Sequence, residues 1–283
     1  TRDLSKASVF GNILWLAGPM VFGPWTNVLY NVVDRMYIGH IPDAAANALT
    51  GVGITFPIIC IVTAFANLFG GGGAPLFSIA WGRGNRDHAE TIISNSFVLL
   101  IGTGIALTVI VLLIKRPLLY LFGASDVTFP YADGYLSIYI CGSVFVMISL
   151  GMNNFINAQG FARMGMLTVL IGAVLNIVLD PIFIFVLNMG VQGAAIATVI
   201  SQLASAAWAV LFLTGKRVTF RIRRSRMRLQ AKLVKDIVFL GFSGFIMAVT
   251  NSGVQVVCNA TLQTFGGDLY VGVMTVINSI RGI

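Results

Sequence analysis

Long apolar runs separated by short polar or glycine-rich breaks make up almost the whole chain. A helix that crosses the hydrocarbon core of a bilayer needs about 20 apolar residues. Seven runs reach this length and an eighth begins at Tyr270. Because unpaired backbone groups cannot face lipid, we predict helices for all of them. The predicted spans are Val9–Val33, Thr50–Phe69, Thr91–Ile114, Tyr131–Ile156, Met164–Leu187, Val191–Leu213 and Lys235–Leu262.

Glycine and proline occur inside two of these runs. Gly18-Pro19 and Gly23-Pro24 interrupt the first run, and each proline removes a backbone donor, so we expect the helix to bend there. The run Gly70–Gly73, followed by Pro75, is expected to loosen the second helix near its end. Such bends suit a helix that moves during transport, although ordinary membrane helices also tolerate glycine and proline.

Composition supports a membrane protein. Of the 283 residues, 57% are hydrophobic and 10% are charged, with a mean hydropathy of +0.89. Soluble domains carry roughly a quarter charged residues, so this chain lacks the charged shell that water requires. The three cysteines lie in apolar runs and are predicted to be buried small hydrophobes, with no disulfide or metal pattern. We expect the long first run to stay in the membrane rather than to be cleaved.

Basic residues flank the spans unevenly. If seven spans alternate, fourteen of the 18 Lys and Arg fall on one side, whereas Lys115 and Arg116 fall on the other. The positive-inside rule then places the N-terminus in the cytoplasm of a multi-pass protein of the cell (inner) membrane. The stretch Lys216–Lys235 carries nine of these residues and is predicted to be a solvated linker at the anionic leaflet. Nucleic acid is not an expected partner, because the basic residues lie between apolar runs.

A weak internal repeat suggests two homologous halves. When the last runs are aligned on the first, Thr26-Asn27 falls on Thr250-Asn251 and Asp34 falls on Cys258, so the second copy lacks the carboxylate. We therefore predict an all-α polytopic membrane protein in three parts. They are a six-helix N-terminal lobe at 1–213, a basic cytoplasmic linker at 214–234 and the truncated start of a C-terminal lobe at 235–283.

Four polar residues inside the spans are candidate site residues. Asp34 lies near the outer end of the first run, and Asp180 lies seven residues before the end of the fifth. Thr198 has a matching depth in the sixth run, and Asn176 lies one turn from Asp180 on the same face. Two carboxylates can share a proton, and with an amide and a hydroxyl they offer oxygen ligands to Na⁺. Alternatively, Asn176 and Thr198 only join helices through hydrogen bonds.

Other polar residues are weaker candidates. Arg35 is a possible counter-ion, although adjacent helical residues point in different directions. His40 and His88 are predicted to lie in solvated loops. A polar cluster near the inner end of the fourth run is expected to be interfacial or to line the cavity. The cluster consists of Asn153, Asn154, Asn157 and Gln159.

Several segments resemble the multidrug and toxic compound extrusion (MATE) family of transporters. The resemblance is carried by VDRMYIGH at 33–40, ALTGVGITFP at 48–57, NAQG at 157–160, NIVLDPIF at 176–183 and GVQGAAIAT at 190–198. It extends over the whole chain, and the Asn-x-x-x-Asp-Pro segment with the following Gly-Ala-Ala-x-Ala-Thr is fairly specific. Most of a C-terminal lobe is missing relative to this family.

The resemblance implies a fold of twelve helices in two lobes around a central cavity. It also implies export of small amphipathic, cationic drugs in exchange for Na⁺ or H⁺, without catalysis or a further cofactor. The ion site of prokaryotic members matches Asp34, Asn176, Asp180 and Thr198. The full-length protein is expected to be monomeric. Alternatives are a flippase for lipid or polysaccharide precursors, and a non-transporting receptor or channel. Acidic residues in the spans argue against the flippase, and the internal repeat argues against the receptor.

Overall fold

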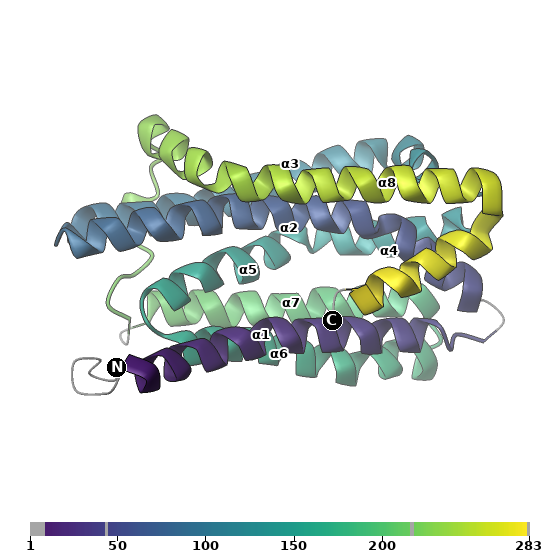
Figure 1. Ribbon diagram of the computed structural model, residues 1–283, viewed down its shortest axis with the longest axis horizontal. Helices are drawn as coiled ribbons and strands as arrows, with labels where there is room; N and C mark the ends of the chain where they lie inside the picture. Colours follow the sequence, from purple (N-terminus) through teal and green to yellow (C-terminus); the bar gives the residue numbers. More distant parts are fainter. Residues whose placement is uncertain (1–8, 43–44, 216–217, 282–283) are drawn as a thin grey trace.

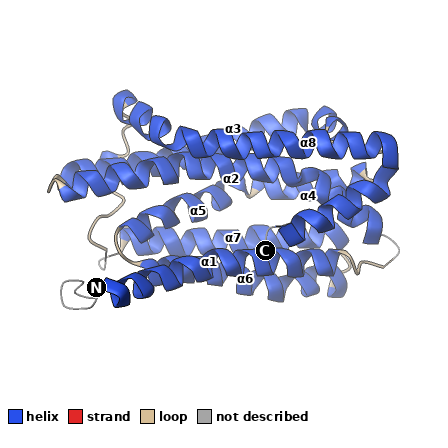
Figure 2. Cartoon of the chain, in the orientation of Figure 1, coloured by secondary structure: helices blue, strands red, loops and turns tan. Residues whose placement is uncertain are grey.

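All described elements of the computed structural model are helical (Figure 2). The structure describes residues 9–42, 45–215 and 218–281, without the side chains of several residues in the first helix and at 279–281. The elements are α1 (Val9–Ile38), α2 (Ala45–Gly82), α3 (Arg86–Leu121), α4 (Phe129–Cys141), α5 (Ser143–Ala158), α6 (Ala162–Pro181), the π-helical turn η1 (Ile182–Val186), α7 (Gly190–Thr214), the 3-10 turn η2 (Arg224–Arg226) and α8 (Ala231–Arg281).

The helices form an elongated bundle with two recognisable ends (Figure 1). At one end lie the start of α1, the turn between α2 and α3, and the segment that joins α7 to α8; we call it the linker end. The end of α1, the start of α2 and a sharp bend in α8 lie at the opposite end, the kink end. In sequence order the helices therefore run back and forth between the two ends, as expected for consecutive membrane spans.

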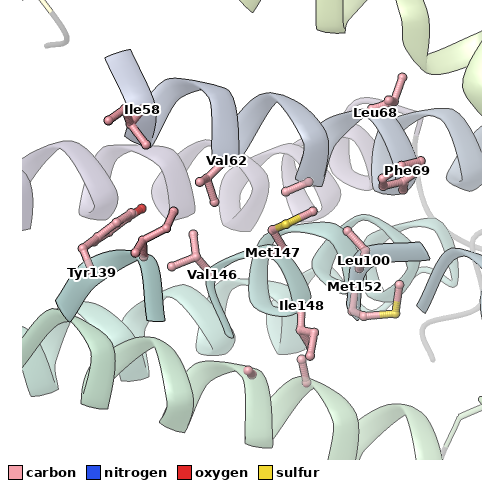
Figure 3. Close-up of a cluster of buried hydrophobic side chains, with 14 of the residues drawn as sticks. Ile58, Val62, Leu68, Phe69, Leu100, Tyr139, Val146, Met147, Ile148 and Met152 are labelled. Atoms are coloured by element: carbon pink, nitrogen blue, oxygen red, sulfur yellow. The ribbon is translucent and has the colours of Figure 1, made fainter. Parts of the chain in front are cut away.

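The core lies around α2, which packs against α3, α4, α5 and α8. Figure 3 shows how Ile58 and Val62 of α2 face Val146 and Met147 of α5, with Leu100 of α3 close by. On the other side of the bundle, α1 packs against α6, and α7 packs against α5 and α6. The first and sixth helices are thereby adjacent although they are far apart in sequence.

The helices are long and apolar enough to cross a membrane. Within the described residues, five of them meet this criterion, and a sixth span is formed when α4 and α5 are taken together. Together with the composition, this confirms an all-α, multi-pass membrane protein. Several helices are longer than predicted, since α2 has 38 residues and α3 has 36. Hydropathy detects only the apolar centre of a span, whereas these helices continue into polar turns at both ends.

The predicted fourth span, Tyr131–Ile156, is broken at Gly142. The axes of α4 and α5 differ by 55°. A break in a helix leaves backbone carbonyls without their usual donors. The hydroxyl of Thr108 in α3 donates to the carbonyl of Ile140 at 2.8 Å and lies 3.0 Å from the hydroxyl of Ser143. A side chain of a neighbouring helix therefore stabilises the break, and a single sequence run does not reveal such a partner.

The prediction that Gly70–Gly73 and Pro75 loosen α2 is wrong, because α2 continues unbroken to Gly82. The glycines instead permit close packing on several sides. A Cβ atom at Gly70 would lie 2.7 Å from the Cα of Gly151 in α5. At Gly72 it would overlap the carbonyl oxygen of Ile237 in α8, whereas at Gly71 it would meet nothing within 4 Å. Small residues let helix backbones approach in membranes, and here they serve that purpose.

The bends predicted in the first helix are not resolved by the structure. Its backbone is helical from Val9 to Ile38, through both Gly-Pro pairs. The side chains of Pro19 and Pro24 lie outside the described residues. Bending at Gly18-Pro19 and Gly23-Pro24 stays a prediction.

The last two predicted spans are joined directly. They form α8, which contains one non-helical residue, Gly267, with φ +70° and ψ −169°. This backbone conformation is essentially restricted to glycine, so Gly267 marks the sharp bend at the kink end. The part of α8 before the bend lies along α2, and the part after it returns towards α1 (Figure 1).

The segment between α7 and α8 is less solvated than predicted. Val218, Phe220 and Ile222 are buried and belong to the core cluster. Alternating apolar residues lie inside the basic stretch, and the net charge of that stretch concealed them. The cysteine prediction is also wrong, because Cys141 is exposed and Cys60 and Cys258 are partly exposed. In a membrane protein an exposed small hydrophobe can face lipid, so burial in protein does not follow from an apolar sequence context.

Candidate functional site

A cavity of about 280 Å³ lies between α1, α2, α4, α5 and α7, and the end of α8 reaches it through Asn278. Its polar lining comprises Tyr30, Asn31, Asp34, Arg35, Thr198 and Gln202. Aromatic rings of Phe56, Tyr135 and Tyr139 form much of the rest. The cavity thus combines one carboxylate with several π faces, a combination suited to an organic cation.

Three of the predicted site residues form a buried hydrogen-bonded group on α6 and α7. Asn176 Nδ2 donates to Asp180 Oδ1 at 3.0 Å and to Thr198 Oγ1 at 3.4 Å. The Thr198 hydroxyl donates to the carbonyl of Ala194 one turn earlier, at 2.9 Å. The helical spacing of four residues places Asn176 and Asp180 on one face, which is the face that α7 covers. The amide therefore fixes both the carboxylate and the hydroxyl.

Asp34 reaches the same place from α1. Its side chain is buried, lines the cavity and lies close enough to Asp180 for the two carboxyl groups to interact. The packing of α1 on α6 brings these helices together. Asp34 and Thr198 face the cavity, whereas Asn176 and Asp180 lie behind them. The structure therefore brings all four predicted residues into one cluster at the wall of the cavity.

Three oxygen atoms of this cluster are left without a hydrogen-bond partner among the described residues. They are Asp34 Oδ1, Asn176 Oδ1 and Asp180 Oδ2. A buried polar atom without a partner is costly, so each such atom requires an explanation. Carboxylate and amide oxygens are ligands that a hard cation prefers, and a carboxylate oxygen can also take a proton. The cluster thus has the chemistry of a site for a small cation or a proton.

A proline and a π-helical turn follow this cluster directly. Pro181 comes immediately after Asp180, and the chain continues as η1 rather than as regular α-helix. Proline has no backbone N–H, so it disturbs the ladder of helical hydrogen bonds at this point. Short π-helical turns are frequent at functional sites. The sequence contained the proline, but it did not predict the π-helical turn.

Several lining residues were not predicted as site residues, although helical spacing could have found them. Tyr30 lies four residues before Asp34, and Gln202 lies four residues after Thr198. Residues so spaced share a helix face. Tyr139 follows Tyr135 at the same spacing, and their rings stack with centroids 6.0 Å apart. Apolar content made these tyrosines look like ordinary membrane residues.

Arg35 does not simply serve as a counter-ion for the neighbouring carboxylate. Its Nη1 donates to the carbonyl of Thr275 in α8 at 3.1 Å. Its guanidinium also lies over the ring of Phe56, 5.3 Å from the centroid. Arg35 therefore connects α1 with α2 and with the last part of α8. The charge of Arg35 still acts on Asp34 electrostatically, because both line the cavity.

The remaining polar candidates have local roles. Gln159 is buried and pairs with the backbone of Phe220, so it neither faces the interface nor lines the cavity. Asn154 donates to the carbonyl of Leu150 on its own helix. His40 is exposed in the turn after α1, and its Nδ1 lies 2.7 Å from the carbonyl of Met36. His88 is exposed but lies in the first turn of α3 rather than in a loop.

A family comparison places the chain among membrane transporters. The MatE family profile matches residues 19–182, more than half of the chain. The matched region includes Asp34, Asn176 and Asp180. The chain therefore belongs to the MATE family, whose members are cation-coupled transporters rather than enzymes.

Individual relatives agree with this assignment. The multidrug export protein MepA of Staphylococcus saprophyticus is 28% identical over 265 residues, which are 92% of this chain and 57% of that protein. The MATE multidrug transporter DinF-BH, solved in complex with a rhodamine dye, has a TM-score of 0.92 and 32% identity, over 99% of this chain and 63% of that one. An inward-facing MATE transporter of the MOP superfamily gives a TM-score of 0.82 at 26% identity, over 90% of this chain and 59% of that one. The chain thus spans less than two thirds of the length of these relatives.

Proposed function

We propose that this chain is part of a secondary antiporter that exports organic cations or drugs in exchange for Na⁺ or H⁺. The coupling ion would bind at Asp34, Asn176, Asp180 and Thr198. The observation that carries the proposal is the group of three buried oxygens without partners at the wall of an aromatic cavity. An apolar or amide-only cluster would join the helices without the cost of buried carboxylates.

Coupling would work through the repulsion between Asp34 and Asp180. Two ionised carboxylates in a low dielectric repel strongly, and a bound Na⁺ or a proton removes this repulsion. Their helices, α1 and α6, could then approach, and the cavity beside them would shrink. An ion shifts such an equilibrium only by binding the two states unequally. A cationic cargo and the coupling ion would thus compete for the same negative charge.

The nature of the cargo follows from the lining of the cavity. Tyr135, Tyr139 and Phe56 offer π faces, and Asp34 supplies a negative charge. Relatives whose names state multidrug export, and a relative solved with a rhodamine dye, support the same class of cargo. We propose small amphipathic cations rather than phosphate-bearing lipid precursors.

The proposed protein would be monomeric and lie in the cell membrane with its N-terminus in the cytoplasm. Basic residues support this orientation, because Arg86, Arg163 and the stretch that includes η2 lie at the linker end. Lys115 lies towards the other end of α3. Residues 1–213 would form the N-terminal lobe, 214–234 a cytoplasmic linker and 235–283 the start of a second lobe. The position of α8 at the side of α2, outside the cluster of α1 and α4 to α7, is compatible with this division.

The decisive experiment uses the full-length protein in proteoliposomes. Efflux of a cationic rhodamine dye would be measured with a Na⁺ gradient and with a pH gradient imposed separately. Asp34→Asn and Asp180→Asn keep the side-chain shape but remove the charge, and each is expected to abolish gradient-driven efflux. Asp133→Asn is the matched control, since Asp133 pairs with Lys115 at 2.7 Å away from the site. Normal efflux by both site variants under either gradient would show that the cluster is structural.

A further inference from the structure

The segment between α7 and α8 is docked on the linker end of the bundle. The side-chain amide of Gln159 pairs with the backbone of Phe220 in both directions, because its Nε2 donates to the carbonyl at 3.2 Å and its Oε1 accepts from the N–H at 3.0 Å. The ring of Phe220 packs edge-on against Phe77 and Trp81 of α2. Gln159 and Phe220 are both buried. An exposed flexible linker would make none of these contacts.

A buried carboxylate on α3 holds the next part of this segment. The side chain of Glu90 is only 2% exposed, and its Oε2 lies 2.8 Å from Nε of Arg223 and 3.5 Å from Nε of Arg226. Arg86 lies 3.8 Å from the other carboxylate oxygen. Arg226 also forms an ion pair with Asp87. A carboxylate so buried needs such partners, so the segment cannot leave α3 without a large penalty.

Backbone groups complete the docking. Ser94 Oγ accepts from the N–H of Arg223 at 3.1 Å. Asn95 Nδ2 donates to the carbonyl of Arg226, and its Oδ1 accepts from the N–H of Gln230, both at 3.1 Å. Gln230 is the residue before the start of α8. The docked part therefore ends where α8 begins.

The first turns of α8 touch α2 at backbone distance. A Cβ atom at Gly72 would overlap the carbonyl of Ile237, and one at Gly241 would overlap the carbonyl of Leu68. Both glycines lie near the linker end of their helices. We call the docked segment 218–230 and this glycine crossing together the anchor.

The contacts of α8 at the kink end are of a different kind. Ser125 Oγ donates to Asp268 Oδ2 at 2.9 Å, and Thr50 Oγ1 donates to the carbonyl of Asp268 at 3.2 Å. The third is the hydrogen bond from Arg35 to Thr275. Single hydrogen bonds between partly exposed groups exchange readily with water, at little net cost. Ser252 donates to the carbonyl of Pro57 at 2.9 Å between the two ends.

We propose that the anchor stays closed throughout transport and that α8 moves about it, breaking the contacts of Asp268 and Thr275 at the kink end. Glu90 is then a positioning residue: it binds no cargo, but it fixes the point from which α8 pivots. Opening the anchor would leave Glu90 and Gln159 buried without partners, whereas opening the kink end only exchanges hydrogen bonds with water. This inference rests on the proposed transport function, and it assigns to the linker the role of a fixed base.

Two disulfides test the proposal in the full-length protein after Cys60, Cys141 and Cys258 are replaced by alanine. Ser94→Cys with Arg223→Cys bridges the anchor, and Ser125→Cys with Asp268→Cys bridges the kink end. Rhodamine efflux is measured before oxidation, after oxidation and after reduction. We expect the oxidised anchor pair to export at the rate of its reduced form. The oxidised kink-end pair is expected to lose efflux and to regain it with a reductant. A block by the anchor disulfide, or continued efflux with the kink-end disulfide, would overturn the proposal.

Glu90→Gln adds a measurement that a purely structural role would not satisfy. This variant should export more slowly and should be cleaved faster by trypsin at Arg224 and Arg228, because the segment is released. The oxidised Ser94–Arg223 cysteine pair should restore efflux to the Glu90→Gln protein. Slow efflux that the disulfide does not restore would contradict a positioning role.

Spin labels distinguish a failed anchor from a failed transport function. If the unmodified parent exports no rhodamine under either gradient, the proposed function fails and the anchor is tested by distances alone. Arg83→Cys with Arg228→Cys reports on the anchor, and Tyr120→Cys with Leu269→Cys reports on the kink end. The anchor pair should keep one distance in high Na⁺, in Na⁺-free buffer and at acid pH, while the kink-end pair changes. A shift confined to the anchor pair would refute the proposal.

Discussion

Replacing Thr198 with alanine should weaken coupling-ion binding without a matching loss of stability. The hydroxyl has two roles in the structure: it donates to the carbonyl of Ala194 and accepts from Asn176 at 3.4 Å, while its oxygen faces the cavity. Thr168 provides a matched control in α6. It is buried and donates to the carbonyl one turn earlier, Met164, at 3.1 Å, and it does not line the cavity that holds the carboxylate cluster.

The expected magnitude follows from these contacts. Loss of one neutral hydrogen-bonding group costs about 0.5–1.5 kcal/mol net. The long Asn176–Thr198 distance places that bond at the weak end of this range, while the lost cavity oxygen adds to it. Since about 1.4 kcal/mol corresponds to a tenfold change in an equilibrium constant, the ion concentration for half-maximal efflux should rise about 2- to 12-fold. Thr198→Ser, which keeps the hydroxyl, should stay near the parent value.

Efflux by the full-length protein, titrated with Na⁺ and separately with H⁺, provides the measurement. Thermal unfolding in detergent provides the control, because both Thr198→Ala and Thr168→Ala lose the same bond to their own helix. We expect similar small losses of stability in the two variants and a shifted ion dependence in only one. If Thr168→Ala shifts the ion dependence as much as Thr198→Ala does, or if neither shifts it, the reasoning about the cavity oxygen is refuted.

Three further predictions concern topology and packing. A single cysteine at Ser225 should be protected from an impermeant thiol reagent in intact cells and one at Asn188 should react; the reverse pattern would invert the proposed orientation. Gly72→Ala should lower thermal stability by about 1–3 kcal/mol through overpacking against α8, whereas Gly71→Ala, which meets open space, should be nearly neutral. Gln159→Ala should cost about 1–3 kcal/mol for each group of Phe220 that it leaves unpaired, and a melting temperature equal to that of Asn154→Ala would contradict it.

Most of the fold was predictable because hydropathy reports directly on lipid exposure. The centres of the spans and the all-α class follow from runs of about 20 apolar residues. The break at Gly142 was not predictable, since it depends on Thr108 of another helix capping the freed carbonyl. The π-helical turn after Pro181 was likewise missed, because proline in a membrane helix is compatible with several local geometries.

The candidate site was predictable to the level of its four polar residues, because buried charge is rare in membrane spans and depth along a helix can be counted. Helical arithmetic placed Asn176 and Asp180 on one face and Thr198 at their level, and the structure shows the corresponding hydrogen bonds. The aromatic lining was missed, because tyrosines in a hydrophobic run give no signal unless the spacing from a known site residue is used. The ion that this cluster binds stays a prediction.

The glycine run and the basic linker were misjudged for a common physical reason. Glycine removes both the constraint on backbone angles and the bulk of a side chain, so one sequence is compatible with a bend or with a close contact. Only the position of a second helix decides between them, and Gly241 opposite Gly72 decides for contact. Likewise, an arginine is solvated unless a buried acid faces it, and Glu90 lies more than a hundred residues before Arg223. Both errors concern residues whose role depends on what α8 brings with it, so the inner attachment of α8 could be found only in three dimensions.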